Sequence, residues 1–296
     1  MITLGDLRIH FINDGVTHVD AGGAFGLVPR VLWSRYLQPD DDNRVPMMNL
    51  NLLVEAGERK IVIDTGLGRK LDEKAVANWR IERPHGDLID ALARLGVQPT
   101  DVDLVIDTHL HSDHSGGNTI LDDAGNIRPA FPHAEYVVQR REYEDAIRPN
   151  ERTAATYLLY NYEPLYKSGQ LRLLDGDVEL APGVTGHVTR GHTPGHMSVR
   201  LESGGQHALF VCDMASYAVH FERLAWMTAY DVEPLVTLET KRRWQQWALE
   251  TGALLIFPHD TQRPAGRLTH DAKGKLHVAA EHSRRQRQAA CGGGAD

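Results

Sequence analysis

The stretch from Thr108 to Gly117, THLHSDHSGG, decides how this 296-residue sequence is interpreted. Within six consecutive positions it places four side chains that can bind a metal ion: His109, His111, Asp113 and His114. The first two histidines are two residues apart, so in extended backbone they point the same way. The aspartate and the third histidine follow on a glycine-containing turn and can reach a second point nearby. Because imidazole and carboxylate suit zinc and its first-row neighbours, the segment predicts donors for two adjacent ions.

The segments around this stretch predict an α/β fold. Apolar or β-branched runs predict strands at LRIHFI, NLNLLVEA, KIVIDTG, DLVIDT, AEYVVQ, VTGHVT, MSVRLE, HALFVCD and ALLIFP. Helices are expected at GDLIDALARLG, REYEDAIR, TAATYLLYNYEPLY and PLVTLETKRRWQQWALET. Strands come early in each half of the chain and helices cover them, which predicts two sheets packed face to face in a four-layer αββα sandwich.

Three later residues can complete the two metal sites. His196 lies in GHTPGH directly before a strand, and Asp213 and His259 end the strands HALFVCD and ALLIFPH. Each lies where a strand begins or ends, so all three could meet at one edge of the sheets. Asp213 could bridge both ions through its two oxygens. His192, in the same GHTPGH turn, is an alternative ligand to His196.

Composition narrows the class of protein. The sequence is 42% hydrophobic and 24% charged, with a formal net charge of -8, so nucleic acid is not the expected partner. Its two cysteines predict no disulfide framework, which favours a reducing compartment. With neither a signal-peptide pattern nor an 18-residue apolar run, we expect a cytoplasmic protein with no membrane contact. Residues 1–283 are expected to form one domain, and residues 284–296 a disordered tail.

The order of the motifs resembles one family of metalloenzymes. HLHSDH, followed by GHTPGH, CD and PHD, is similar to the pattern of the metallo-β-lactamase superfamily, and VIDTG resembles an earlier motif of that family. GVTHVDAGGAFGLVPRVLW and WMTAYDVEP resemble segments of its quorum-quenching lactonases of the YtnP type. This resemblance implies the αββα sandwich, two zinc ions, hydrolysis of N-acyl-homoserine lactones and a homodimer.

The resemblance also implies a role for each site residue. The first ion would be bound by His109, His111 and His196, because the family pattern favours the second histidine of GHTPGH. The second ion would be bound by Asp113, His114 and His259, and Asp213 would bridge the two. Asp64 would orient a ligand imidazole through a hydrogen bond.

The expected mechanism is attack of a metal-bridging hydroxide on a lactone or ester carbonyl. Asp113 would take and return a proton. Related lactonases have a tyrosine three residues after the bridging aspartate, where this chain has Ser216, so Tyr217 is the expected oxyanion donor. His220 and Tyr230 are alternatives for that role. The segment holding Phe25, Leu27, Val28 and Trp33 is expected either to form an apolar wall for an acyl chain or to pack in the core or a dimer contact.

Several rival functions fit parts of this pattern. The same metal site could hydrolyse aryl esters or phosphotriesters, and less readily thioesters. Diiron flavoproteins of this fold have a carboxylate where this chain has His111. Persulfide dioxygenases use one iron and lack a full second site, whereas His114 and His259 are present here. A non-catalytic binding protein would not need all seven metal-binding side chains.

Overall fold

Two seven-stranded sheets form the centre of the molecule. The structure is a computed structural model that describes residues 1–280, so the expected tail at 284–296 lies outside the described residues. The first sheet runs in the order β1 (Ile2–Leu4), β2 (Leu7–Asp20), β3 (Arg44–Ala56), β4 (Arg59–Ile63), β5 (Leu104–Ile106), β8 (Glu135–Gln139), β9 (Leu171–Leu174). The second runs in the order β10 (Val178–Ala181), β11 (Val184–Val188), β12 (Met197–Ser203), β13 (Gln206–Phe210), β14 (Leu254–Ile256), β15 (Ala265–His270), β16 (Leu276–Ala280). A separate hairpin pairs β6 (Thr119–Leu121) with β7 (Ile127–Pro129).

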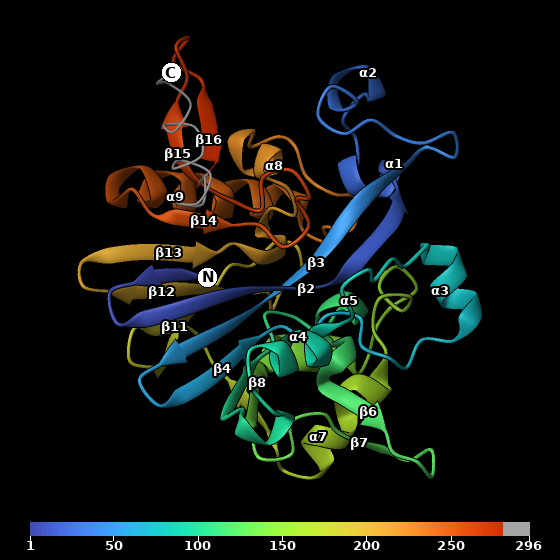
Figure 1. The fold of residues 1–296 in the computed structure, drawn as a ribbon. Coiled ribbons are helices and arrows are strands. Elements are labelled where there is room, and N and C mark those ends of the chain that lie inside the picture. The colour runs from blue at the N-terminus through green and yellow to red at the C-terminus, as the bar shows by residue number, and fades with distance from the viewer. Residues whose placement is uncertain (281–296) are drawn as a thin grey trace, which may run out of the picture.

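Helices cover the outer face of each sheet, which confirms the predicted four-layer sandwich (Figure 1). On the first sheet these are α4 (Leu88–Arg94), α6 (Arg140–Ala146) and α7 (Glu163–Lys167). On the second they are α8 (Ala218–Glu222) and α9 (Pro234–Thr251). The short helices α1 (Ala21–Phe25), α2 (Arg30–Trp33), α3 (Glu73–Trp79) and α5 (Ser112–Ser115) lie in the connections, as do the 3₁₀ turns η1 (Pro99–Asp101), η2 (Gly116–Asn118), η3 (Leu159–Asn161) and η4 (Cys212–Met214).

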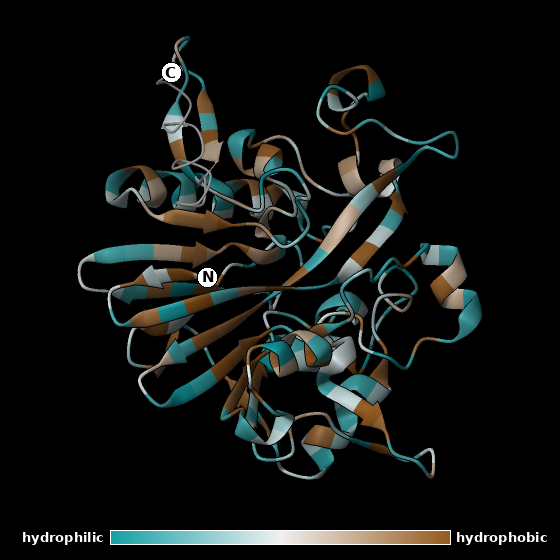
Figure 2. Ribbon diagram, in the orientation of Figure 1, coloured by the Kyte–Doolittle hydropathy of each residue, from teal (hydrophilic) through white to brown (hydrophobic). Residues whose placement is uncertain are grey.

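Strand alternation builds the core. Along β4, Ile61 and Ile63 face the second sheet, while Val62 faces the helices. The inner layer joins these isoleucines to Val199 and Phe210 of the second sheet, all fully buried. Figure 2 shows the corresponding apolar bands along the strands. Burying each such side chain stabilises the fold by roughly 1.5–3 kcal/mol, so the two sheets form a firm support for the loops at their edges.

The connections at one edge of both sheets lie together. Strands β4 and β5 are parallel, as are β13 and β14, so within each pair the carboxyl ends lie at the same edge. The sheets are also joined directly at this edge: Met197 donates to the carbonyl of Thr108, and Leu50 donates to the carbonyl of Pro258. The loops carrying the histidine- and aspartate-rich motifs therefore leave the two sheets side by side.

One expected helix is largely absent. The segment TAATYLLYNYEPLY forms turns, with only η3 and the short α7 within it. Its tyrosines explain the difference, because Tyr157 donates to Glu142 and Tyr162 donates to the carbonyl of Ala146. These tertiary hydrogen bonds fix the segment in a shape that a continuous helix would not allow. Among residues 1–280, no helix has both the length and the apolar character needed to cross a bilayer.

Candidate metal centre and active site

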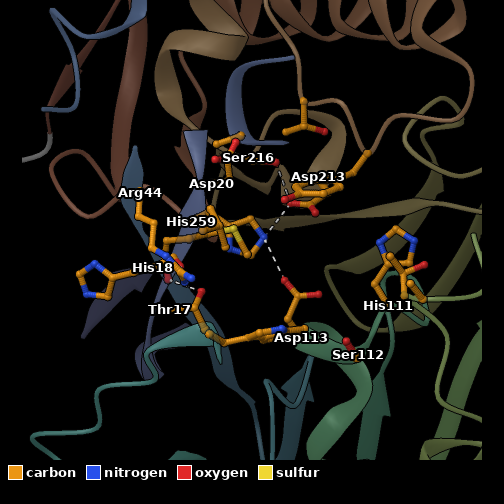
Figure 3. Close-up of a pocket in the computed structure, with 18 of the residues that line it drawn as sticks. Thr17, His18, Asp20, Arg44, His111, Ser112, Asp113, Asp213, Ser216 and His259 are labelled. Carbon is orange, nitrogen blue, oxygen red and sulfur yellow. Dashed lines mark hydrogen bonds and ion pairs between the residues drawn. The ribbon is translucent and has the colours of Figure 1, made fainter. Parts of the chain in front are cut away.

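A cavity of about 610 Å³ opens where these loops meet. It is lined by residues from β2, β3, the HLHSDH loop and the loops after β13 and β14. Figure 3 shows Arg44 and His18 on one side of the cavity and His111 on the other, with Asp113, Asp213 and His259 between them. Its volume falls in the ordinary range for small-molecule sites, about 300–1,000 Å³.

Three histidines form the first group of donors. The ring nitrogens of His109, His111 and His192 lie within 4.8 Å of one another. Nε2 of His192 is 3.1 Å from Nδ1 of His111. Burial lowers the pKa of His109 and His111 well below the usual value, which keeps both imidazoles neutral, the form that binds a metal.

The second group combines one carboxylate with two histidines. Donor atoms of Asp113, His114 and His259 lie within 4.8 Å of one another. Nε2 of His114 is 3.2 Å from Nε2 of His259, and Oδ2 of Asp113 is 3.7 Å and 3.8 Å from these two atoms. A nitrogen and oxygen donor set of this kind suits a first-row divalent cation.

Asp213 lies between the two groups. Its Oδ2 is 3.3 Å from Nε2 of His192 and 3.9 Å from Nε2 of His109. Its Oδ1 is 3.0 Å from Nε2 of His259. One carboxylate thus presents an oxygen to each group, the arrangement expected of a bridging ligand.

The outer nitrogens of these rings are held by other groups. Nδ1 of His114 is 2.9 Å from Oδ2 of Asp64, a contact of the kind that the family resemblance implies for Asp64. Nδ1 of His192 is 3.0 Å from Asp231, and Nδ1 of His259 is 2.7 Å from the carbonyl of Met48. Such partners fix the tautomer and the orientation of a ligand imidazole. The contact of Asp231 with His192 is not predicted from the sequence, although Asp231 lies in the motif WMTAYDVEP.

The Nε2 of His109, which lies among the donor atoms, supports a metal centre. Nε2 of His109 is buried and has no hydrogen-bond partner among residues 1–280, while its Nδ1 is 3.1 Å from the hydroxyl of Thr108. A buried polar atom without a partner is costly unless something satisfies it. A cation between His109 and Asp213 would do so, and the residues present therefore fit divalent metal ions.

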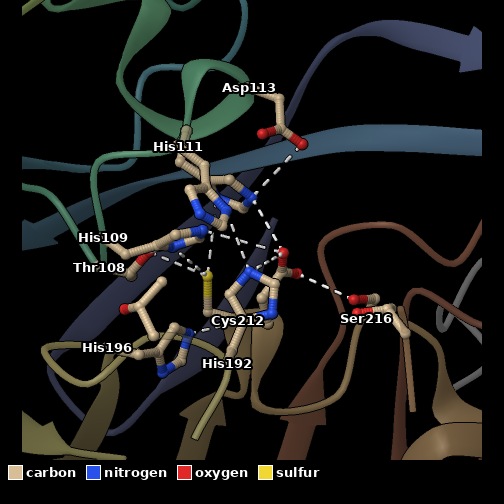
Figure 4. Close-up of polar contacts among 12 residues, drawn as sticks. Thr108, His109, His111, Asp113, His192, His196, Cys212 and Ser216 are labelled. Carbon is tan, nitrogen blue, oxygen red and sulfur yellow. Dashed lines mark hydrogen bonds and ion pairs between the residues drawn. The ribbon is translucent and has the colours of Figure 1, made fainter. Parts of the chain in front are cut away.

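His196 is not placed as predicted. Its Nε2 accepts a hydrogen bond from the backbone N–H of Asp213 at 3.1 Å, and its Nδ1 is 2.8 Å from the hydroxyl of Thr189. Its donor atom lies within 4.8 Å of His109 and Cys212, but both ring nitrogens are engaged within the protein. Figure 4 shows His196 and Asp113 at opposite ends of the group of contacts. The histidine of GHTPGH that faces His111 and Asp213 is His192, so the structure corrects the expectation for this turn.

The candidate oxyanion donors lie in different surroundings. Tyr217 lines the cavity, but its hydroxyl donates to the carbonyl of Pro46 at 3.3 Å, and burial raises its pKa well above 10. Ser216 lines the cavity and donates to Oδ1 of Asp213 at 3.2 Å. Tyr230 also lines the cavity, whereas His220 is buried, packs edge-on against Phe25 and Tyr217, and does not line it.

The segment expected to form an apolar wall, or to pack in the core or a dimer contact, divides between the core and the surface. Phe25 and Trp33 are buried and stack with ring centroids 5.0 Å apart, in a cluster with Tyr217 and Trp226. Leu27 is fully exposed and Val28 is half-buried. None of the four predicted residues lines the cavity, so core packing accounts for the two aromatic ones.

The comparisons with known proteins agree with this geometry. The model of the family described as the metallo-beta-lactamase superfamily matches residues 45–256. The N-acyl homoserine lactonase AiiA of Bacillus thuringiensis subsp. kurstaki is 28% identical over 225 residues, which cover 71% of this chain and 80% of that protein.

Two solved structures extend the comparison to the whole fold. A probable metal-dependent hydrolase from Staphylococcus aureus has a TM-score of 0.85 and 30% identity, covering 95% of this chain and all of that one. AidC, a dizinc quorum-quenching lactonase, has a TM-score of 0.77 at 21% identity and covers 95% of this chain and 97% of its own, a likeness of fold. This chain therefore belongs to the metallo-β-lactamase superfamily and is a hydrolase of that family.

Proposed function

We propose that this protein is a dinuclear zinc hydrolase that opens a lactone ring, with N-acyl-homoserine lactones as its substrates. The observation that carries the proposal is the pair of donor groups that share Asp213 at the cavity. Relatives named N-acyl homoserine lactonase match most of the chain, which supports lactones as the substrate class.

The proposed ligand set differs from the predicted one at a single position. The first ion would be bound by His109, His111 and His192, and the second by Asp113, His114 and His259, with Asp213 shared by both. When bound, two zinc ions lower the pKa of a water molecule to about 7 and polarise a carbonyl oxygen. His196 supports Asp213 through its hydrogen bond to the backbone.

Asp113 is the proposed proton carrier. It lines the cavity and its side chain is 14% exposed, so it faces both the donor group and the space for a substrate. A carboxylate there can hold the proton released by the attacking water and return it to the leaving oxygen of the ring. The predicted contact of Tyr217 with the oxyanion requires that its bond to Pro46 be exchanged for one to the substrate, and it stays a prediction.

The cavity wall supports an acylated substrate. Val19, Ala24, Met47 and Trp79 provide apolar surface, and Thr17, Arg44 and Asn78 provide polar groups. A mixed wall of this kind can contact both an alkyl chain and the amide that joins it to a lactone ring.

A substrate panel tests the proposal. Zinc-loaded protein is assayed with homoserine lactones of several acyl lengths, aryl esters and phosphotriesters, with metal-free protein as the control. We expect turnover of the lactones to exceed that of the other two classes. Strong turnover of aryl esters or phosphotriesters with inert lactones would contradict the substrate class. No turnover of any class by protein with two bound zinc ions would contradict hydrolysis at this site.

We also propose, from the resemblance to lactonases, a single-domain cytoplasmic enzyme that acts as a homodimer. Light scattering on a sizing column measures its mass in solution. Twice the chain mass of 33.0 kDa is expected, and a monomer at micromolar concentration would contradict the dimer.

A further inference from the structure

A buried carboxylate lies next to the candidate metal centre, and its hydrogen bonds among residues 1–280 go to none of the proposed ligands. Glu142 is fully buried and comes from α6, on the outer face of the first sheet. Burial raises its pKa. Burying a charged side chain is costly, so its hydrogen bonds have to offset the loss of water.

Among residues 1–280, every hydrogen bond of this carboxylate goes to a neighbour of the first donor group. Oε1 accepts from the backbone N–H of Leu110, between His109 and His111, at 3.0 Å. Oε2 accepts from the hydroxyl of Thr193, directly after His192. One side chain thus joins the two loops that carry the three histidines.

A third contact supports His111 from the side. Oε1 of Glu142 also accepts from the hydroxyl of Tyr157 at 2.9 Å. The ring of Tyr157 lies 5.1 Å from that of His111, centroid to centroid, and the two residues form an isolated β-bridge. The tyrosine is therefore fixed at one end by Glu142 and packs against the histidine at the other.

The backbone at the start of α6 adds a steric restraint. A Cβ atom at Gly195 would lie 2.2 Å from the backbone nitrogen of Glu142, so the GHTPGH turn sits directly against this helix. Only a glycine permits that approach. The turn that carries His192 is thus held against α6 by the bond from Thr193 and by the close backbone approach at Gly195.

We propose that Glu142 is the positioning residue of the first metal site. It sets the distance between His192 and the pair His109 and His111, whereas none of its hydrogen bonds among the described residues reaches Asp113, His114 or His259. This inference rests on the proposed function for the presence of two ions, but it concerns their affinity and not the substrate.

The test measures zinc affinity at each site separately, by competition with a chromophoric chelator. In a His259→Ala background the second site is weakened, so the measured zinc affinity is that of the first site. In a His192→Ala background the first site is weakened, so the measured affinity is that of the second. Glu142→Ala is expected to weaken zinc binding about 10–100-fold in the first background, the usual cost of losing a supporting hydrogen bond. In the second background the affinity should stay unchanged.

Two further variants separate positioning from general damage. Glu142→Gln keeps a carbonyl oxygen for Leu110 and Tyr157, and the hydroxyl of Thr193 can turn to accept from its amide, so most of the affinity should return. Glu222→Ala is the matched control: the side chain of Glu222 is 5% exposed, accepts from the backbone N–H of Val278 and pairs with Arg263, and it belongs to neither donor group. It should lower thermal stability without changing zinc affinity.

The outcomes are distinct. Unchanged zinc affinity in Glu142→Ala, an equal loss at both sites, or the same loss in Glu222→Ala would overturn the inference. If Glu142→Ala does not fold, Thr193→Val removes one of the same bonds and should weaken the first site alone. Inert lactones with intact zinc binding would contradict the proposed function and leave this inference standing. Failure of the unaltered protein to bind two zinc ions would contradict both the proposed function and the inference about Glu142.

Discussion

His192 and His196 lie four positions apart in one turn, but their ring nitrogens have different partners. His192 presents Nε2 to His111 and Asp213, whereas both nitrogens of His196 are engaged by the protein. Burial lowers the pKa of His196 to about 3, so it accepts the N–H of Asp213 as a neutral ring. One histidine is thus suited to bind an ion and the other to hold the bridging aspartate.

Alanine at each histidine should separate these roles. His192→Ala removes a ligand, so the zinc content should fall from near two towards one per chain. His196→Ala leaves the N–H of Asp213 without its partner, which should lower the free energy of unfolding by about 1–3 kcal/mol while most of the zinc is retained. Metal analysis and denaturant unfolding measure both effects. The reverse pattern, with zinc lost only from His196→Ala, would show that His196 and not His192 binds the first ion.

The proton transfer proposed for Asp113 can be separated from metal binding. Asp113→Asn keeps an oxygen that can contact the ion but cannot hold a proton, so kcat should fall about 10²–10⁴-fold. The measurement is lactone hydrolysis at full zinc loading, with zinc content as the control. Activity close to that of the unaltered protein would remove Asp113 from the chemistry.

At the scale of elements, the sequence predicted most of what positions the site. The strands before HLHSDH, Asp213 and His259 carry clear apolar runs, so the meeting of their ends could be expected. The choice between His192 and His196 could not, because both lie in one turn. That choice depends on elements that pack against the turn: Glu142 of α6 on one side, and α9 on the other, where a Cβ at Gly191 would lie 2.4 Å from Oγ1 of Thr237.

The helix predicted over TAATYLLYNYEPLY is wrong for a similar reason, since hydrogen bonds to residues distant in the sequence decide the shape of this segment.

Helix α9 carries a buried lysine that predicts a pH effect on stability. Nζ of Lys241 donates to the carbonyls of His220 and Trp226, and burial lowers its pKa from 10.5 to about 8. Between these values the unfolded chain binds more protons than the folded one, so stability should rise with pH through that window.

A methionine at this position isolates the effect. Relative to Lys241→Met, the unaltered protein should gain up to roughly 3 kcal/mol in free energy of unfolding from pH 7 to pH 10. Denaturant unfolding of both proteins at equal metal loading measures the difference. A difference that does not change with pH would show that Lys241 keeps its ordinary pKa.

At the scale of the whole molecule, the candidate metal centre lies where the loops of the two sheets meet. Its donors come from loops after β5 in the first sheet and from loops next to β12, β13 and β14 in the second. Ions bound there would hold both halves of the sandwich together, so they should contribute to global stability.

The overall fold could be predicted because the apolar strand pattern and the order of the motifs extend over most of the sequence. The orientation of a single side chain at the sheet edge could not be predicted, because it depends on local packing.

Removal of metal tests this coupling. A ligand present at a thousand times its dissociation constant stabilises the folded state by about 4 kcal/mol. Prolonged dialysis against a chelator should therefore lower Tm by on the order of 10 °C, and added zinc should restore it. Scanning calorimetry measures the shift. An unchanged Tm after verified loss of metal would show that the two halves are held together by their apolar core alone.

The proposed hydrolysis requires two ions bound around Asp213. Anomalous diffraction at the zinc edge from zinc-loaded crystals measures this directly. We expect two peaks, one beside His109, His111 and His192 and one beside Asp113, His114 and His259, with the carboxylate of Asp213 between them. A single peak, or peaks away from Asp213, would contradict the dinuclear centre and the hydrolysis proposed from it.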